Sequence, residues 1–354
     1  METYQGVLQR YRDRMDIPSY TVPVSLLEGN TPLIPVPQVA KAIEARCEVW
    51  VKVEGMNPTG SFKDRGMTVA ISEALGRGAK AVICASTGNT AASAAAYAAH
   101  AGMACLVIIP AGKVAAGKLA GAVAYGARVI QIDGSFDDAL QLVVAICESN
   151  PIVMVNSLNP YRLEGQKTAA FEVIETLGSA PDWLCLPVGN AGNITAYWMG
   201  FQQAHARQSS GLPRLLGVQA SGAAPLVLGH AVEKPETVAT AIRIGKPARA
   251  EQALQAAAQS NGRIIAVADA ELISMQRLLA GSGVWVEPAS AAGLAGLAAE
   301  VRSGKLDVTG KRVVSVCTGH GLKDADIITR SMPAPVIVPA RMEALTDVIQ
   351  QMGI

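Results

Sequence analysis

The sequence carries almost no net charge. Its 30 lysines and arginines nearly balance its 29 aspartates and glutamates, which leaves a formal net charge of +1. Proteins that bind nucleic acid or an anionic membrane usually carry a strongly basic face or segment. We therefore expect neither nucleic acid nor a membrane among its partners.

Paired cysteine spacings are missing as well. The six cysteines occur singly, and no C-x-x-C pair points to a zinc site or a redox motif. The first residues, M-E-T-Y-Q-G-V-L, contain no apolar stretch typical of a signal peptide. We expect reduced, buried thiols, no bound metal and a cytoplasmic location.

No apolar run is long enough to span a bilayer without interruption. Between Lys80 and Lys113 there is no acidic residue, lysine or arginine, but glycines, a proline and the polar run Ser86–Thr90 interrupt the segment. This pattern predicts a buried strand, loop and helix rather than a membrane span.

Short apolar runs alternate with helical stretches along most of the chain, which is typical of right-handed βαβ units. We predict an α/β protein with two open, twisted, mostly parallel sheets, each with helices on both faces, the smaller domain being inserted into the larger. The expected domains are residues 1–57 (N-terminal arm and first part of the large domain), 58–155 (small domain) and 156–354 (remainder of the large domain). Strands are expected at 48–53, 81–84, 104–109, 128–132, 152–155, 183–188, 215–219, 264–267, 284–286 and 312–317. Helices are expected at 7–15, 36–45, from about 64 onward, 89–100, 113–125, 136–149, 161–177, 194–207, 269–280 and 288–301.

The first of four polar loops behind predicted strands carries Lys63. The turn residues Asn57–Gly60 precede it, and a helix is expected to begin beside it. A lysine in this position can reach a pocket where desolvation lowers its pKa and makes the amine nucleophilic. A solvated lysine at the start of a helix is the ordinary alternative.

The other three loops suit the recognition of anions. Ser86–Thr90 precedes a helix and could bind a carboxylate, although simple helix capping is the competing interpretation. Gly189–Asn193 is a glycine-rich turn of the kind that closes around a phosphate. A dinucleotide site would need an acidic residue after the next strand, where Gln219 stands, so a small phosphorylated cofactor fits better than NAD. The fourth loop places the hydroxyl of Thr318 near His320, which we interpret as a loop residue.

Together these runs resemble the pyridoxal-phosphate enzymes of the tryptophan-synthase β-like fold, and within that family the threonine synthases. They follow one another in the family's order over nearly the whole chain, and the run from Asn156 to Thr168 is similar to threonine synthases in particular. The runs that carry the resemblance are N-P-T-G-S-F-K-D-R (57–65), S-T-G-N-T (86–90), N-S-L-N-P-Y-R-L-E-G-Q-K-T (156–168), G-N-A-G-N (189–193) and C-T-G-H-G-L-K-D (317–324).

The resemblance implies pyridoxal 5′-phosphate as the cofactor, joined covalently to Lys63, which would also carry protons during the reaction. Asn89 would bind the ring oxygen of the cofactor and Thr318 its pyridine nitrogen. The backbone that would hold the cofactor phosphate is that of Gly189, Asn190, Ala191, Gly192 and Asn193.

The same resemblance implies O-phospho-L-homoserine as the small-molecule substrate, converted with water to L-threonine and phosphate, and a homodimer as the assembly. Lys113 and Lys118 would add positive charge near the site. The substrate carboxylate would be bound by Ser86, Thr87 and Thr90, and the substrate phosphate by Asn156, Ser157 and Arg162.

Two other functions would use parts of the same framework. A serine or threonine dehydratase, or a cysteine-synthase-like lyase, would share Lys63 and the phosphate loop but would not need an arginine-bearing second phosphate site. A binding protein without activity would have no use for a reactive lysine. The run from Asn156 to Thr168 therefore favours threonine synthesis.

Overall fold

The computed structural model describes residues 3–111, 116–134, 136–329 and 334–353. The chain divides into two compact units, residues 1–324 and 325–354. Every strand found in the described ranges belongs to the first unit. No helix within those ranges combines the length and the apolar character needed to cross a membrane.

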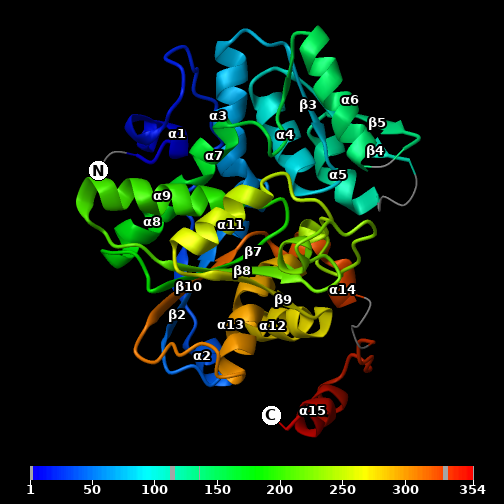
Figure 1. The fold of residues 1–354 in the computed structure, drawn as a ribbon. Helices are drawn as coiled ribbons and strands as arrows, with labels where there is room; N and C mark the ends of the chain where they lie inside the picture. The colour runs from blue at the N-terminus through cyan, green and yellow to red at the C-terminus, as the bar shows by residue number, and fades with distance from the viewer. Residues whose placement is uncertain (1–2, 112–115, 135, 330–333, 354) are drawn as a thin grey trace. The chain divides into compact units, whose positions relative to one another are not determined.

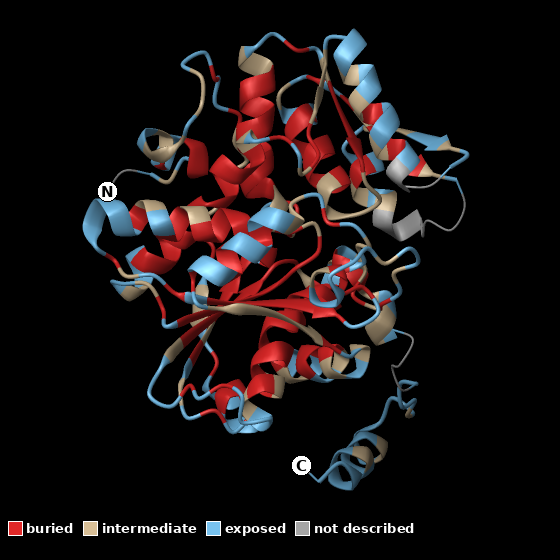
Figure 2. Ribbon diagram, viewed as in Figure 1, coloured by how far each residue is buried: buried red, intermediate tan, exposed pale blue. Residues whose placement is uncertain are grey.

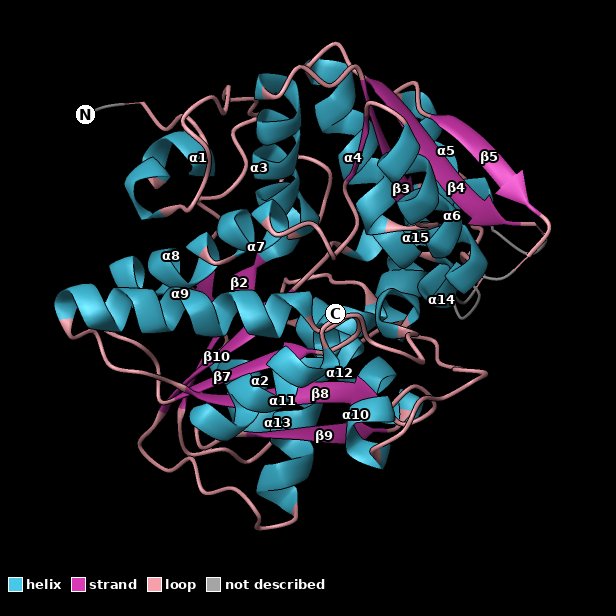
Figure 3. Ribbon diagram, turned by 45° about the horizontal axis from the view of Figure 1, so that its top comes forward, coloured by secondary structure: helices cyan, strands magenta, loops and turns pink. Residues whose placement is uncertain are grey.

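Two sheets organise the first unit (Figure 3). The larger runs in the order β1-β2-β10-β7-β8-β9 and the smaller in the order β5-β4-β3-β6. All neighbouring strands are parallel except β1 and β2, so the predicted α/β class with two mostly parallel sheets is confirmed. The strands are β1 (Leu33–Pro35), β2 (Glu48–Val53), β3 (Ala81–Ala85), β4 (Ala104–Pro110), β5 (Arg128–Ile132), β6 (Ile152–Met154), β7 (Trp183–Pro187), β8 (Arg214–Ala220), β9 (Arg263–Val267) and β10 (Arg312–Cys317).

Helices connect these strands. The α-helices of the first unit are α1 (Val7–Arg10), α2 (Pro37–Ala42), α3 (Lys63–Gly76), α4 (Asn89–His100), α5 (Ala116–Ala124), α6 (Phe136–Ser149), α7 (Tyr161–Gln166), α8 (Thr168–Leu177), α9 (Gly192–Gln208), α10 (Pro225–Leu228), α11 (Ala250–Gln259), α12 (Asp269–Gly281) and α13 (Ala292–Arg302). The 3₁₀ helices are η1 (Arg12–Arg14), η2 (Glu54–Met56), η3 (Thr240–Ile242), η4 (Pro288–Ala291) and η5 (Gly321–Asp324). The second unit contains α14 (Asp326–Thr329) and α15 (Met342–Gln351).

The large sheet is covered on both faces. Successive side chains of a strand point to opposite faces, so Val313 packs into one apolar cluster and Val314 into another. Helices α2, α12 and α13 form the first layer, and α8, α9 and α11 form the second (Figure 1). Burial on both faces explains why the strands are continuous apolar runs rather than alternating ones.

The small sheet has the same construction. Val82 packs towards α3, α4 and α5, whereas Ile83 packs towards α6. Helix α4 is buried from Ala91 to Ala98, as the red ribbon in Figure 2 shows. Alanine leaves space for close packing on all sides of this helix, which explains its composition.

Two helices of the first unit approach so closely that glycine is required between them. A Cβ at Gly165 in α7 would lie 1.8 Å from the carbonyl oxygen of Arg65 in α3. A Cβ at Gly66 would in turn lie 2.6 Å from the carbonyl oxygen of Arg162. This crossing holds the start of α3, where Lys63 lies, against the helix that carries Arg162.

A buried network of charged side chains holds α3 against neighbouring elements. The Arg65 guanidinium lies 2.7 Å from the Glu54 carboxylate and 2.6 Å from that of Glu172. Lys52 of β2 also contacts Glu172, with Nζ 2.6 Å from Oε2. Because a buried ion is costly without a partner, these contacts tie α3, β2 and α8 together in one arrangement.

The prediction of a strand at residues 284–286 is wrong. This segment forms only an isolated bridge between Val286 and His320. The apolar run Val284-Trp285-Val286 resembles a buried strand, but Pro288 follows two residues later and cannot donate to a ladder. Burial against α12 and α13, rather than sheet pairing, accounts for its apolar character.

Several helix boundaries also differ from the expectation. The helix predicted for 161–177 divides at Lys167 into α7 and α8, where the Thr168 hydroxyl donates to the carbonyl of Gly165 at 2.6 Å. The helix predicted for 7–15 ends at Arg10 and is followed by a 3₁₀ turn. The start of the helix predicted for 113–125 lies partly outside the described residues.

Candidate active site

Lys63 opens helix α3, directly after the turn that the sequence predicted. Gly60 has φ +84° in this turn, and Asp64 accepts hydrogen bonds from the backbone and hydroxyl of Thr59 at 2.7 and 2.6 Å. The pKa of Lys63 falls to about 7, first because of burial and then because of the positive charge of Arg162, while Glu287 opposes the shift. A large fraction of this amine is therefore neutral near pH 7, as nucleophilic attack requires.

The Lys63 turn is joined to the loop after β10. The backbone N–H of Phe62 donates to the carbonyl of Thr318 at 2.9 Å, and that of His320 donates to Gly60 at 2.9 Å. A Cβ at Gly55 would lie 2.7 Å from the His320 nitrogen, so the two segments are in close backbone contact. Because β2 and β10 are neighbours in the sheet, their carboxyl ends bring these loops to one place.

Thr318 is buried, and its hydroxyl is oriented by a residue that sequence reasoning did not select. The Oγ atoms of Ser290 and Thr318 lie 2.8 Å apart, and Ser290 Oγ also accepts from the backbone N–H of Gly319 at 2.8 Å. The available signal was a single hydroxyl in the run P-A-S-A-A-G at 288–293.

Asn89 contacts a second residue that the sequence did not reveal. Its Nδ2 lies 3.2 and 3.1 Å from the two carboxylate oxygens of Glu287. Burial raises the pKa of Glu287 to about 7, against the effects of Asn89, Lys323 and Lys63, with Asp324 adding to the rise. The sequence signal was an isolated acidic residue between the apolar runs V-W-V and P-A-S-A-A.

The loop Ser86–Thr90 leaves the start of α4 open. Helix α4 has no side-chain cap, and Ser86 Oγ instead accepts from Gly88 N at 3.2 Å within the loop. A Cβ at Gly88 would meet nothing within 4 Å. The interpretation of this loop as ordinary side-chain capping of the helix is therefore wrong. Uncapped N–H groups beside the hydroxyls of Ser86, Thr87 and Thr90 can bind a carboxylate.

The loop Gly189–Asn193 presents a similar opening at the start of α9. Ala191 takes φ +65°, helix α9 has no side-chain cap, and a Cβ at Gly192 would meet nothing within 4 Å. The buried Nδ2 of Asn193 has no hydrogen-bond partner in the described part of the chain. Asn190 accepts a long bond from Ala248 N at 3.5 Å. Free donors at the start of a long helix suit a phosphate.

Arg162 is 1% exposed, which rules out the alternative of a solvated arginine on a helix surface. Its Nη1 donates to the carbonyl of Val155 at 2.8 Å, but its buried Nε has no partner within the residues that the structure describes. Burial lowers its pKa to about 10, and the nearby cation of Arg249 adds to that effect. Arg249, which sequence reasoning missed, donates to the backbone carbonyls of Ser157 and Leu158 at 3.0 and 3.2 Å. Cationic groups thus gather where the sequence predicted a phosphate site.

Unlike Arg162, Asn156 forms hydrogen bonds to the backbone of Ala85 with both ends of its side-chain amide. Its Nδ2 donates to the carbonyl of Ala85 at 2.9 Å, and its Oδ1 accepts from the backbone N–H of the same residue at 3.0 Å. These two bonds extend the pairing of β3 to the point where the Ser86 loop begins. The amide therefore supports the loop, and its predicted contact with a substrate phosphate stays a prediction.

The sequence also singled out Lys113, Lys118 and His320. Lys113 lies outside the described residues, as does the side chain of Lys118. His320 accepts from Leu322 N at 3.1 Å, and its ring packs edge-on against Trp285, which fits the loop role expected for it. The described residues contain no group of three or more His, Cys, Asp or Glu side chains that could hold a metal ion.

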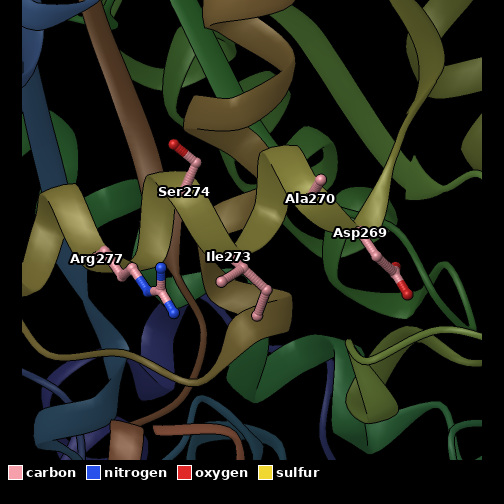
Figure 4. A pocket seen from close by; sticks show the side chains of 5 residues that line it. All are labelled: Asp269, Ala270, Ile273, Ser274 and Arg277. Carbon is pink, nitrogen blue, oxygen red and sulfur yellow. The ribbon is translucent and has the colours of Figure 1, made fainter. Parts of the chain in front are cut away.

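A surface hollow of about 450 Å³ lies elsewhere, along α12 (Figure 4). Asp269 in this hollow already accepts from the Thr237 hydroxyl at 2.5 Å and from Val238 N at 2.9 Å. None of the residues around Lys63 lines it, so we do not assign a reaction to it. Its lining residues are Asp269, Ala270, Ile273, Ser274 and Arg277.

Comparison with known proteins agrees with this geometry. Residues 24–319 match the family model described as pyridoxal-phosphate dependent enzyme. The chain is 52% identical over 356 residues to the threonine synthase of Mycobacterium leprae, covering 100% of this chain and 97% of that protein. It is 57% identical over 325 residues to the threonine synthase of Synechocystis, covering 91% and 84% of the two chains.

Solved structures agree on the fold alone. Maize serine racemase superposes with a TM-score of 0.74 at 20% identity, covering 93% of this chain and 97% of that one. A tomato (Solanum lycopersicum) threonine deaminase superposes with a TM-score of 0.73 at 21% identity, covering 91% and 86%. At such identities the shared fold carries no information about the reaction.

Proposed function

This chain belongs to the pyridoxal-phosphate dependent enzymes and, within them, to the threonine synthases, and from that premise we propose that the site around Lys63 converts O-phospho-L-homoserine and water to L-threonine and phosphate. It is a lyase that depends on pyridoxal phosphate. Arg162 is the observation that favours this substrate. Its guanidinium is buried, its Nε has no hydrogen-bond partner among the described residues, and, in addition to burial, its positive charge lowers the pKa of Lys63.

The residues at the site fit the cofactor. Because the pKa of Lys63 is about 7, its amine is partly uncharged near neutral pH and can bond to an aldehyde. The uncapped N-terminus of α9 and the amide nitrogen of Asn193, which has no hydrogen-bond partner among the described residues, can hold a phosphate. When bound, pyridoxal phosphate supplies an electron-withdrawing ring that makes protons next to the substrate amine acidic. Asn89 and Thr318 would meet the ring oxygen and the ring nitrogen.

Thr318 gives this ring a particular environment. Its hydroxyl is neutral, and Ser290 holds it at 2.8 Å without adding charge. A carboxylate in that position would keep the ring nitrogen protonated, whereas a hydroxyl does not. With the cofactor bound, Thr318 would therefore tune its ring through a hydrogen bond rather than through an ion pair.

The remaining work belongs to the side chains around the substrate. Lys63 can accept and return protons because its pKa of about 7 permits both forms near neutral pH. The N-terminus of α4 with Ser86, Thr87 and Thr90 would bind the substrate carboxylate, and Arg162 with Ser157 would bind its phosphate. Fixing the substrate at both ends places the reacting carbons beside the lysine amine. Asn156 would act through the Ala85 backbone that it holds.

The decisive experiment measures phosphate release from O-phospho-L-homoserine and identifies the organic product. Stoichiometric L-threonine and phosphate support the proposal. A keto acid formed from L-serine or L-threonine, without turnover of the phosphorylated substrate, would instead indicate a dehydratase. L-Homoserine is the matched control, because it lacks the phosphate that Arg162 would bind.

We also propose that the protein is a cytoplasmic homodimer, with residues 58–155 as a small domain between the two parts of a large one, 1–57 and 156–354, of which residues 325–354 form a compact unit of their own. The strands of the small sheet fall within 81–154, and those of the large sheet fall outside it, which supports these boundaries. Analytical ultracentrifugation tests the dimer, and limited proteolysis with mass spectrometry tests the domain boundaries.

A further inference from the structure

Glu287 occupies a confined position between two loops of the site. It is 4% exposed, and its backbone N–H donates to the carbonyl of Gly319 at 3.1 Å. A Cβ at Gly319 would lie 2.5 Å from Glu287 Oε1, so the carboxylate lies directly against that glycine. On its other side both oxygens contact the amide of Asn89. The carboxylate thus bridges the end of β10 and the start of α4.

The charges that face this carboxylate are few. Gly319, against which the carboxylate lies, forms a bridge with Ser61, two residues before Lys63. The charged groups that act on Glu287 are Lys63 of α3 and Lys323 and Asp324 of η5, while α4 contributes only the neutral amide of Asn89. Within the described residues no side chain other than Asn89 donates a hydrogen bond to it. Burying a carboxylate without an ion pair is unfavourable. A structural need at this position could be met by glutamine, which has the same shape and no charge.

We propose that Glu287 is a positioning residue for the reaction, whose carboxylate fixes the amide of Asn89 and whose negative charge stabilises the protonated form of Lys63. The inference rests on the proposed function for its link to the cofactor. One carboxylate would then control both residues that meet the reactive end of the cofactor.

The orientation of Asn89 follows from the chemistry of its amide. Above its pKa of about 7, Glu287 is a carboxylate that accepts hydrogen bonds and donates none, so in this ionised form it selects the Nδ2 end of the amide. One N–H of Nδ2 then remains for the ring oxygen of the cofactor. A glutamine at 287 both donates and accepts, and it would permit either orientation of Asn89.

The effect on Lys63 has a definite sign. Burial and the Arg162 cation lower the pKa of Lys63, whereas the charge of Glu287 raises it. Glu287→Gln removes the raising effect and leaves the other two. The amine should therefore become neutral at a lower pH in the variant, while the uncharged glutamine relieves the cost of the buried carboxylate and allows the protein to fold.

The first test uses the protein without cofactor. Reductive methylation of Lys63, followed by peptide mass spectrometry across the neutral pH range, reports the pKa of its amine because only the neutral form reacts. We expect the apparent pKa in Glu287→Gln to fall by about 0.5 or more relative to the wild type. Glu236→Gln, an exposed glutamate, is the matched control and should reproduce the wild-type profile.

The second test uses the holoenzyme. The absorbance of the bound cofactor is followed across the same pH range, and cofactor affinity is measured by equilibrium dialysis. Glu287→Gln should shift the absorbance titration and weaken cofactor binding, and Glu287→Asp should restore part of the wild-type titration. A purely structural role would lower thermal stability but leave both pH profiles in place.

Identical methylation and absorbance profiles in the wild type and Glu287→Gln would overturn the inference. The methylation experiment needs neither substrate nor turnover. A failure of phosphate release from O-phospho-L-homoserine would therefore count against the proposed function and would leave the result on Glu287 standing.

Discussion

The backbone N–H of Phe62 donates a hydrogen bond to the carbonyl oxygen of Thr318 at 2.9 Å. This bond joins the residue before Lys63 to the backbone of Thr318, whose side chain is buried. Two loops that are far apart in the sequence are thereby held together, and under the proposed function they would present an amine and a neutral hydroxyl to one cofactor.

Lys63→Ala should abolish covalent attachment of pyridoxal phosphate. Borohydride reduction of the wild-type holoenzyme should leave the pyridoxyl group on the peptide that contains Lys63, and the variant should carry no label and show no turnover. Peptide mass spectrometry makes the measurement, with the exposed Lys80→Ala as the control. Label on another lysine in active wild-type enzyme would contradict the assignment.

Ser290→Ala should weaken cofactor binding about tenfold. The substitution removes the partner of the Thr318 hydroxyl and of the Gly319 N–H, and a lost buried hydrogen bond costs on the order of 1 kcal/mol or more. Equilibrium dialysis measures the affinity. Ser303→Ala is the control, because the Ser303 hydroxyl donates to the carbonyl of Glu300. An unchanged affinity would show that Ser290 does not orient Thr318 for the cofactor.

Arg162→Ala should lower kcat/KM for O-phospho-L-homoserine by about 100-fold and leave cofactor binding nearly unchanged, because a charge-assisted hydrogen bond contributes about 1.5–3 kcal/mol. Arg249→Gln should raise KM by a smaller factor, because Arg249 supports the Ser157–Leu158 backbone. The exposed Arg302→Gln is the control. Unchanged kcat/KM in Arg162→Ala would remove this residue from the substrate site.

Glu172→Gln should lower the free energy of unfolding by about 3 kcal/mol or more, because it removes the carboxylate that the buried Lys52 contacts and leaves the buried Arg65 with Glu54 alone. Urea denaturation measures the loss. Glu175→Gln breaks the partly exposed pair with Arg10 and should cost less than about 1 kcal/mol. Equal losses in the two variants would contradict the importance assigned to the buried network.

The same network predicts a pH dependence. Burial raises the pKa of the Glu172 carboxyl, but the cations of Arg65 and Lys52 outweigh it and lower that pKa to about 2 from its ordinary value of 4.5. Because the folded-state pKa is depressed, this stabilisation is complete above about pH 4.5 and is lost as the pH falls towards 2. Denaturation in acid should show a smaller change in unfolding free energy for Glu172→Gln than for the wild type. A parallel decline in both proteins would count against the ion pair.

Gly165→Ala should destabilise the protein by about 1–3 kcal/mol, because its Cβ would lie 1.8 Å from the Arg65 carbonyl oxygen. Moving α7 away from α3 should also reduce activity, since that crossing holds Lys63 near Arg162. Gly281→Ala at the end of α12 is the control, because a Cβ there meets nothing within 4 Å. It should be neutral or stabilising by up to about 1 kcal/mol. Thermal unfolding compares the two.

The sequence predicted the parallel α/β architecture and most strand positions, because hydrophobic period and turn residues are local signals. The family resemblance added Lys63, Asn89, Thr318 and the loops before α4 and α9 as site residues, which stay predictions. The strand prediction at 284–286 was wrong, since an apolar run looks the same whether it pairs in a sheet or packs between helices.

The order of the motifs along the chain was enough to identify the family and the cofactor, and it predicts that Lys63 is the reactive lysine. Only the tertiary structure decided which polar groups form hydrogen bonds with one another. Asn89 donates to Glu287, Ser290 and Thr318 share a hydrogen bond, and Asn156 donates to the Ala85 carbonyl. These contacts join segments that are distant in the sequence. A buried polar side chain needs a hydrogen-bond partner because it has lost its contacts with water, but the residues next to it in the chain do not reveal which distant group that partner is.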